Sequence, residues 1–167
     1  LDIPGRKEAA DSIHIGIDWL ASVSFGHVKS VKPRVIVLGG GNTAMDCCRT
    51  ARRLGGDDVK VIVRSGFEEM KASPWEKEDA MGEDIPILNM LVPKEVTHKN
   101  GKITGVTFEK VKAEYDAKGR RSLVPSGEPD RSSMVSQPER SGHVDGSSAM
   151  TGVERRMRRS LKPGPVK

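Results

Sequence analysis

Aromatic residues and cysteines are scarce in this 167-residue chain. Aromatics make up 4% of the residues, and the two cysteines, Cys47 and Cys48, are adjacent. Neighbouring residues on a helix point in different directions, so these thiols are poorly placed to form a disulfide with each other. No CxxC pair and no Cys/His cluster with metal-ligand spacing is present in the sequence. We therefore expect reduced cysteines that act as small packing residues, and no metal site.

Long hydrophobic runs are also missing. The longest apolar stretches are the length of a strand, which excludes a helix able to span a bilayer. The first residues, LDIPGRKEAADS, have neither the charged-then-apolar pattern of a signal peptide nor an initiator methionine. With reduced cysteines, this predicts a cytoplasmic protein without a membrane partner, and a chain that begins in mid-protein.

The positive charge is concentrated near the C-terminus. Residues 131–167 hold eight of the 28 basic and three of the 23 acidic residues, which leaves 20 of each sign in residues 1–130. A neutral body argues against nucleic acid as a partner, although binding through the basic segment is an alternative. Ser, Gly, Pro and Arg dominate residues 131–167, so we expect a disordered basic tail. Its composition is also what an out-of-frame translation would produce.

Hydrophobic periodicity divides residues 1–130 into alternating helices and strands. We predict a helix over 8–23, a strand that runs into glycines over 34–41, a helix over 43–56 and a strand over 59–65. After a loop, a short helix is expected with Ser73 as its N-cap and Pro74 in its first position.

Further strands follow this helix. The run IPILNMLV (85–92) is a third strand candidate. VTH (96–98) and KITGVTFEKVKAEY (102–115), joined across Asn100 and Gly101, predict an antiparallel hairpin followed by the polar turn DAKGRR. The predicted fold class is α/β: a Rossmann-like parallel sheet with an antiparallel hairpin or meander insertion, lacking its last strand.

The segment VIVLGGGNTAMD carries the most specific motif. It contains G-x-G-x-x-A as Gly39, Gly41 and Ala44, between a strand and a helix. In such a motif the first glycine permits the tight turn, the second lets backbone amides approach a pyrophosphate, and the third small residue packs the helix close to the sheet. The helix then opens at Asn42 and Thr43, whose N–H groups and positive dipole end face the phosphates.

Alternatives exist for this glycine-rich segment. It could be a structural turn of another α/β protein or the turn of a methyltransferase. A kinase-like phosphate loop is disfavoured because no Gly-Lys-Ser/Thr follows. The return of a second strand within about 30 residues argues against a structural turn. The glycines that continue into AMDCCRTARRL and the arginine after the second strand favour a dinucleotide over a methyltransferase.

The end of the second strand indicates which dinucleotide. NAD enzymes carry Asp or Glu there to bind the ribose 2′-hydroxyl, whereas VKVIV ends in Arg64. A guanidinium can bind a 2′-phosphate through paired, charge-assisted hydrogen bonds, and Lys71 could add a second cation. Both side chains could instead be merely solvated. We predict NADPH as the cofactor.

Other chemistry-bearing residues do not form a recognisable site. Four histidines are scattered without partners, and the acidic residues of the short helix are expected to form a solvated face. We expect Met45 to lie in the core and Trp75 to be a packing residue. No catalytic residue is predicted, as expected where a cofactor carries the chemistry. The residues in question are His14, His27, His98, His143, Glu76, Glu78 and Asp79.

With these residues in hand, the sequence resembles the NADPH-binding domain of the glutamate synthase small-subunit family of FAD-dependent oxidoreductases. The same domain recurs in the amino-terminal part of dihydropyrimidine dehydrogenase. The matching stretches lie within residues 1–130: LDIPG, VIVLGGGNTAMDCCRTARRLGG, VIVRSGFEEMKASPWEKEDA and GVTFEKVKAEYDAKGRR. The resemblance implies that the nicotinamide-side phosphates contact Gly40, Gly41, Asn42 and Thr43. It also implies that the 2′-phosphate is bound by Arg64 and Lys71.

In that family NADPH passes hydride to FAD, and electrons reach iron–sulfur clusters and a partner subunit that reduces a substrate such as 2-iminoglutarate. The family's FAD fingerprint, its iron–sulfur cysteine motifs and its second flavin-binding stretch are not found in this sequence. We therefore expect residues 1–130 to be a partial NAD(P)H-binding domain of a larger flavoprotein, inactive by itself. Its expected partners are the missing FAD domain and a large catalytic subunit. The alternative is a truncated, non-catalytic nucleotide-binding fragment or regulatory module.

Overall fold

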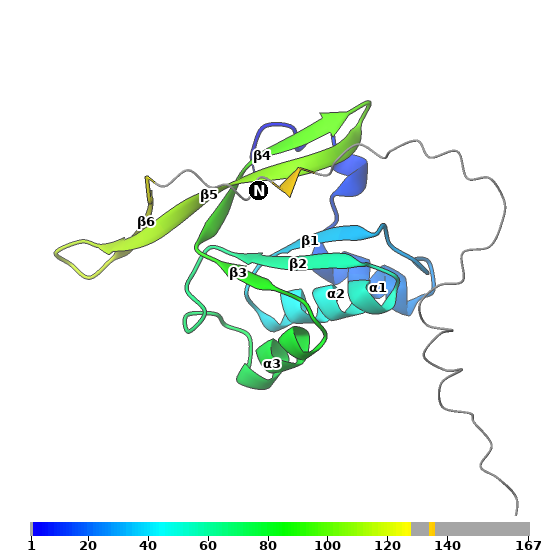
Figure 1. Ribbon diagram of the computed structural model, residues 1–167, viewed down its shortest axis with the longest axis horizontal. Coiled ribbons are helices and arrows are strands. Elements are labelled where there is room, and N and C mark those ends of the chain that lie inside the picture. The colour runs from blue at the N-terminus through cyan, green and yellow to red at the C-terminus, as the bar shows by residue number, and fades with distance from the viewer. Residues whose placement is uncertain (1, 128–133, 136–167) are drawn as a thin grey trace, which may run out of the picture.

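A three-stranded parallel sheet is the centre of the computed structural model, which describes residues 2–127 and 134–135. Its strands are β1 (Arg34–Leu38), β2 (Asp58–Val63) and β3 (Ile87–Asn89), in the order β1-β2-β3. Helices cover one face of this sheet and an antiparallel sheet covers the other (Figure 1). This confirms the predicted α/β class with a parallel sheet and an antiparallel insertion.

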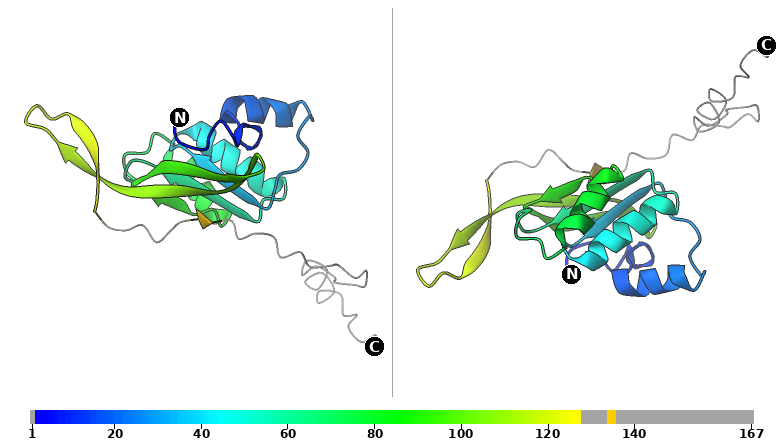
Figure 2. Two further views of the ribbon diagram at one scale, coloured as in Figure 1. Left: turned by 90° about the horizontal axis from the view of Figure 1, so that it is seen from above. Right: turned by 90° about the horizontal axis from the view of Figure 1, so that it is seen from below.

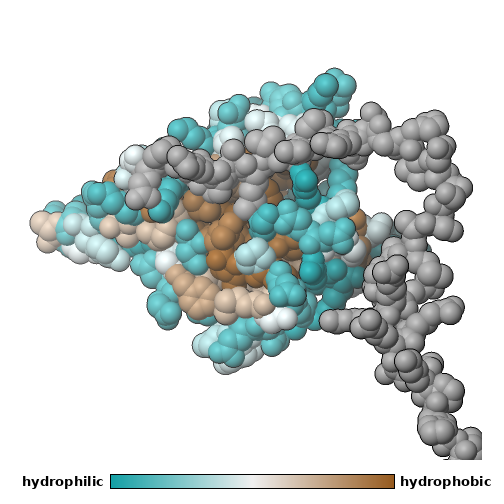
Figure 3. All heavy atoms as spheres, viewed as in Figure 1, coloured by the Kyte–Doolittle hydropathy of each residue, from teal (hydrophilic) through white to brown (hydrophobic). Residues whose placement is uncertain are grey.

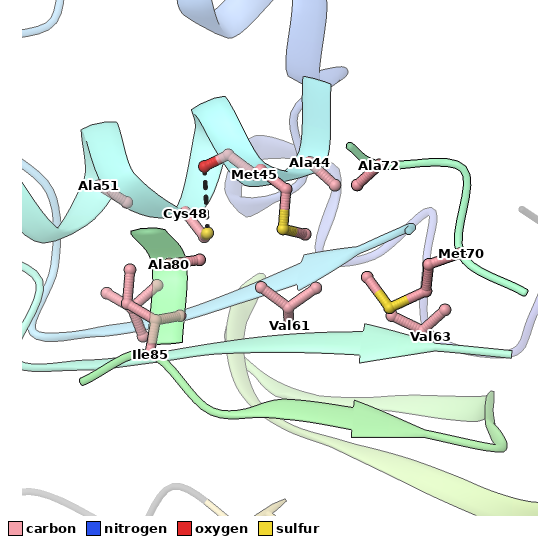
Figure 4. Packing of buried hydrophobic residues seen from close by; sticks show 11 residues of the cluster. Ala44, Met45, Cys48, Ala51, Val61, Val63, Met70, Ala72, Ala80 and Ile85 are labelled. Carbon is pink, nitrogen blue, oxygen red and sulfur yellow. Dashed lines mark hydrogen bonds between the residues drawn. The ribbon is translucent and has the colours of Figure 1, made fainter. Parts of the chain in front are cut away.

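The helical layer contains α1 (Gly16–Ser24), α2 (Asn42–Arg53) and α3 (Pro74–Gly82). Helix α2 connects β1 to the parallel strand β2, which makes a β-α-β unit. The apolar stripe of α2 packs on the sheet, as Figure 4 shows for Ala44, Met45, Cys48 and Ala51 above Val61. Met45 is completely buried, which confirms its predicted place in the core.

Successive residues of β2 serve different layers, because side chains alternate between the two faces of a strand. Val59, Val61 and Val63 belong to the cluster under the helices, whereas Ile62 belongs to the cluster under the antiparallel sheet. A strand that is covered on both faces needs a nearly continuous apolar sequence. In β2 (DVKVIV) the last three residues, Val-Ile-Val, form such a run and are all buried.

The antiparallel layer contains β4 (Leu91–Lys99), β5 (Lys102–Tyr115) and β6 (Arg121–Pro125). Asn100 and Gly101 join β4 to β5 with φ angles of +50° and +73°, as a primed hairpin turn requires, so the predicted hairpin is confirmed. Strand β5 continues past β4 and pairs with β6 from Val111 to Tyr115. We call residues 111–125 the β5–β6 arm, and Figures 1 and 2 show it projecting from the body of the molecule.

The predicted helix over residues 8–23 is wrong in its first half. Residues Ala10–Ser12 form the short 3₁₀-helix η1, Ile13 is extended, and α1 begins only at Gly16. Ala9 is buried under the antiparallel sheet, whereas Trp19 packs with the helical layer. One straight helix presents a single apolar stripe, so it could not serve both layers.

The apolar run 85–92 is not one strand. Residues Ile87–Asn89 pair with β2 in parallel, and Leu91 begins β4 of the antiparallel sheet. Met90 separates the two strands with a φ angle of +60°, a left-handed conformation that redirects the chain. Hydropathy alone cannot reveal this break, because the residues on both sides of it are apolar.

The C-terminal prediction is mostly outside the described residues. Of residues 131–167, only Met134–Val135 is described, as the short strand β7 antiparallel to β5 at Gly105 and Val106. This pair differs from the predicted disorder. Over the described part of the chain, Figure 3 shows hydrophobic side chains gathered in the middle, between the two sheets, and hydrophilic ones around them.

Replacing Met45 by alanine tests the core under α2. The change removes a fully buried side chain and leaves a cavity beside Val61, so we expect the free energy of unfolding to fall by about 2–5 kcal/mol. Urea unfolding followed by circular dichroism measures this loss. Met81 is 45% exposed on α3, so Met81→Ala should change the same quantity by less than about 0.5 kcal/mol. Equal losses would contradict the packing described here.

Candidate functional site

The glycine turn Gly39–Gly41 leads from the carboxyl end of β1 into α2. Gly39 has a φ angle of +142°, which strongly favours glycine, and its N–H donates to the carbonyl of Ile62 on β2 over 3.0 Å. The position of an added Cβ would lie 3.5 Å from the Cβ of Ala44. The turn is therefore tied to β2 while the start of α2 lies close above it.

The next two glycines have different surroundings. A Cβ on Gly40 would lie 2.8 Å from Cγ1 of Val63 and 3.2 Å from Cγ of Met70, so this glycine is required by the packing of the chain itself. A Cβ on Gly41 would have no heavy atom within 4 Å. The missing side chain of Gly41 thus leaves free space on the outer side of the turn.

Backbone donors follow Gly41 at the start of α2. The carbonyl of Gly41 accepts the N–H groups of Ala44 at 2.9 Å and Met45 at 3.3 Å. The N–H groups of Asn42 and Thr43 have no acceptor among residues 2–127 and 134–135. Two free donors at the positive end of a 12-residue helix are suited to an anionic group.

The side chain of Asn42 connects α2 to the start of α3. Its Oδ1 accepts the N–H of Ser73 at 2.9 Å, and its Nδ2 donates to the Ser73 hydroxyl at 3.5 Å. Ser73 and Pro74 occupy the predicted N-cap and first positions of α3, but the Ser73 hydroxyl does not cap its own helix. Sequence reasoning missed this contact, which joins residues 31 positions apart.

The segment between β2 and α3 carries the two predicted cations. Arg64 directly follows Val63, which borders Gly40, and Lys71 directly precedes Ala72, whose N–H donates to the Gly40 carbonyl at 2.9 Å. Arg64 and Lys71 are exposed and make no hydrogen bond or ion pair with another described residue. Both ends of this segment, which we call the cation loop (residues 64–72), are thus fixed beside the glycine turn.

A mostly buried lysine supports the cation loop from α3. Lys77 is 8% exposed, and its Nζ donates to the Phe67 carbonyl at 3.3 Å and lies 4.3 Å from the centre of the Phe67 ring. The ammonium therefore gains both a hydrogen bond and a cation–π contact. This contact holds the middle of the cation loop against α3.

The acidic residues of α3 are not simply a solvated face. Arg49 of α2 forms ion pairs with Glu76 at 3.2 Å, Asp79 at 3.0 Å and Glu83 at 2.9 Å, and the hydrogen bond to Glu83 raises the pKa of Arg49 further above its usual value. These pairs tie α2 to α3, and the predicted solvated face is wrong for Glu76, which is only 23% exposed. Glu78 and Asp79 are exposed as predicted, although Asp79 is also paired. Trp75 does not pack as expected either, since it is 65% exposed.

The remaining candidates are not brought together. His14, His27 and His98 are exposed, and His143 lies outside the described residues. Among residues 2–127 and 134–135, no three His, Cys, Asp or Glu side chains converge in a way that could hold a metal ion.

Both cysteines are free and buried, which confirms the predicted packing role. Burial raises the pKa of the Cys48 thiol to about 11 and also raises the pKa of Cys47, so the reactive thiolate is suppressed near neutral pH. In the described part of the chain, no helix has the length and apolar character needed to cross a membrane.

A parallel β-α-β unit with a glycine turn and free amides at its crossing point defines a Rossmann-type fold. Residues 1–120 match the pyridine nucleotide-disulphide oxidoreductase family, and the chain belongs to this family. The predicted family relationship is thereby confirmed.

Two curated proteins are similar to this chain in sequence. The chain is 36% identical over 112 residues to the NADPH-Fe(3+) oxidoreductase subunit beta of Geobacter sulfurreducens, an alignment that covers 66% of this chain and 17% of the relative. It is 34% identical over 129 residues to the glutamate synthase [NADPH] small chain of Escherichia coli, with 70% and 27% covered. The chain therefore spans only a minor part of each relative's length.

Solved structures agree on the fold. Mycobacterium tuberculosis FprA in complex with NADPH matches with a TM-score of 0.59 and 14% identity, over 77% of this chain and 44% of that chain. At this identity the likeness concerns the fold alone.

Alanine substitutions at neighbouring glycines test the two roles in the turn. Gly40→Ala should lower the free energy of unfolding by about 1–3 kcal/mol, because the new methyl group meets Val63. Gly41→Ala should change it by less than about 1 kcal/mol, because its φ angle of −104° suits alanine and the space is open. Thermal unfolding of the two variants compares them. A large loss in Gly41→Ala would show that this glycine serves the fold.

Proposed function

We propose that this chain contributes the NADPH-binding module of a FAD-dependent oxidoreductase resembling the glutamate synthase small subunit. In this proposal residues 1–130 form the NAD(P)H-binding domain of a larger flavoprotein, which passes hydride from NADPH to FAD and electrons onward to iron–sulfur centres. The observation that carries it is the meeting of two free helix amides and two unpaired cations at one glycine turn.

The diphosphate is assigned to the glycine turn. Gly39 forms the tight turn, Gly40 lets it pack against β2, and Ala44 keeps α2 close to it. Gly41 leaves the space through which a phosphate can reach the N–H groups of Asn42 and Thr43. These amides are preorganised by the helix, so binding costs little reordering.

The 2′-phosphate is assigned to the cation loop. Arg64 offers a planar fork of donors that matches a phosphate, and Lys71 offers a second positive charge. Neither is committed to an acidic partner within the described residues, so both are available to a ligand. The relatives named above carry NADPH in their names, which agrees with this choice.

The chemistry belongs to the nicotinamide ring, which donates a hydride when NADPH is bound. The chain's own residues bind and orient the dinucleotide at the end of β1. No second glycine-rich strand–turn–helix for FAD and no cysteine set for an iron–sulfur cluster occurs among the described residues. We assign FAD to a further domain of the parent protein.

Arg64→Ala tests the cofactor assignment. Loss of a charged contact to the 2′-phosphate should weaken NADPH binding by roughly 10- to 100-fold while NADH binding is unchanged. Isothermal titration of the 167-residue chain with each cofactor measures both dissociation constants. Arg34→Ala is the matched control and should change neither dissociation constant. Arg34 is also exposed, but it lies at the end of β1 that is far from the glycine turn. The assignment fails if Arg64→Ala weakens both cofactors equally or if the parent chain does not prefer NADPH.

Measuring NADPH oxidation distinguishes a cofactor-binding module from an enzyme that is active by itself. We expect the chain to bind NADPH but to leave it unoxidised in the presence of an artificial dye, because no hydride acceptor is held beside the nicotinamide. Absorbance at the reduced-nicotinamide band follows the reaction. Steady oxidation without an added flavoprotein would overturn the proposed inactivity. Binding without turnover, even after the parent flavoprotein is reconstituted, would favour a non-catalytic or regulatory module.

A further inference from the structure

A glutamate lies in the middle of the cation loop. One oxygen of Glu69, Oε2, accepts the N–H of Gly66 at 2.8 Å and an Nη2–H of Arg121 at 2.9 Å. The other, Oε1, accepts the hydroxyl of Tyr115 at 3.4 Å. The carboxylate therefore holds the backbone of its own loop while it binds two residues of the β5–β6 arm.

These arm contacts are long-range. Arg121 and Tyr115 lie 52 and 46 positions after Glu69 in the chain. Figures 1 and 2 show the arm leaving the body of the molecule on the side where the cation loop lies. The arm, which belongs to the antiparallel insertion, thus reaches the segment proposed to recognise the 2′-phosphate.

The contact between Glu69 and Arg121 changes the net charge of the cation loop. The cation loop contains Arg64 and Lys71 but also Glu68 and Glu69, so its own formal charge is zero. A carboxylate in this loop repels a phosphate dianion unless a cation compensates it. The guanidinium of Arg121 pairs with Glu69 at 2.9 Å on the surface, where the two side chains are 29% and 40% exposed, respectively. With Arg121 counted, the loop presents a net positive charge.

We propose that Arg121 of the β5–β6 arm determines the NADPH preference by neutralising Glu69 in the cation loop. This inference rests on the proposed function, since it names a further specificity residue of the same site. Arg121 acts through Glu69 and does not touch the cofactor. The antiparallel insertion is therefore part of the recognition of the 2′-phosphate.

Arg121→Gln tests this proposal in the 167-residue chain. NADPH should bind roughly 3- to 10-fold more weakly, because the loop proposed to hold the 2′-phosphate then carries an uncompensated Glu69, and NADH should bind as before. Arg121→Lys should keep most of the NADPH affinity. Arg120→Gln is the matched control, since Arg120 pairs with Asp116 inside the turn of the arm and should leave both affinities unchanged.

The double variant Glu69→Gln/Arg121→Gln distinguishes charge from loop structure. Removing the carboxylate should restore NADPH binding to within about two-fold of the parent, although the contact with the arm is lost. If Arg121 only kept the loop folded, the double variant would bind no better than Arg121→Gln. That outcome would overturn the proposal.

Glu69→Gln decides the matter if Arg121→Gln does not fold, as judged by circular dichroism. It leaves Arg121 uncompensated, so NADPH should bind more tightly and NADH equally; unchanged or weaker NADPH binding would contradict the proposal. The two proposals fail separately. If Arg64→Ala leaves the NADPH preference intact, the proposed function is wrong. If Arg64→Ala abolishes the preference but Arg121→Gln alters both cofactors alike or neither, only the role of Arg121 is wrong.

Discussion

The close approach of the glycine turn to β2 is the contact on which the rest of the site depends. Gly40 leaves no room for a side chain against Val63 and Met70, and its carbonyl accepts the N–H of Ala72. This contact places the ends of the cation loop beside the turn. Helix α2 begins directly after this turn, so its free amides follow the residue that leaves open space. One tight packing contact thus brings together the proposed binding sites for diphosphate and 2′-phosphate.

A second set of contacts keeps this arrangement rigid. Asn42 joins the start of α2 to Ser73, and Arg49 joins the middle of α2 to the acidic side of α3. Lys77 holds the middle of the cation loop from α3, while Glu69 binds the loop to the arm. The exposed Arg64 and Lys71 are therefore carried by a restrained backbone. Such restraint lowers the entropy that a ligand must remove on binding.

Predictions from the sequence succeeded where the signal was local. The Asn100–Gly101 hairpin and the turn from β1 into α2 each depend on neighbouring residues with special backbone freedom. They failed where one apolar segment serves two layers. The helix predicted over 8–23 and the strand predicted over 85–92 are both divided in this way. Hydropathy reports that a residue is buried, but it does not report which layer covers it.

The sequence by itself determined the β-α-β unit, the glycine motif and the candidate cations, because period, turn residues and strand ends are encoded within about 30 residues. It also indicated NADPH through Arg64. Only the tertiary structure decided which charges are paired. Arg49 binds Glu83, 34 positions away in the chain, and Arg121 binds Glu69, 52 positions away. No local sequence pattern predicts either pair. The spacing of charged side chains does not identify partners so far apart in the chain, because these partners depend on how the layers pack.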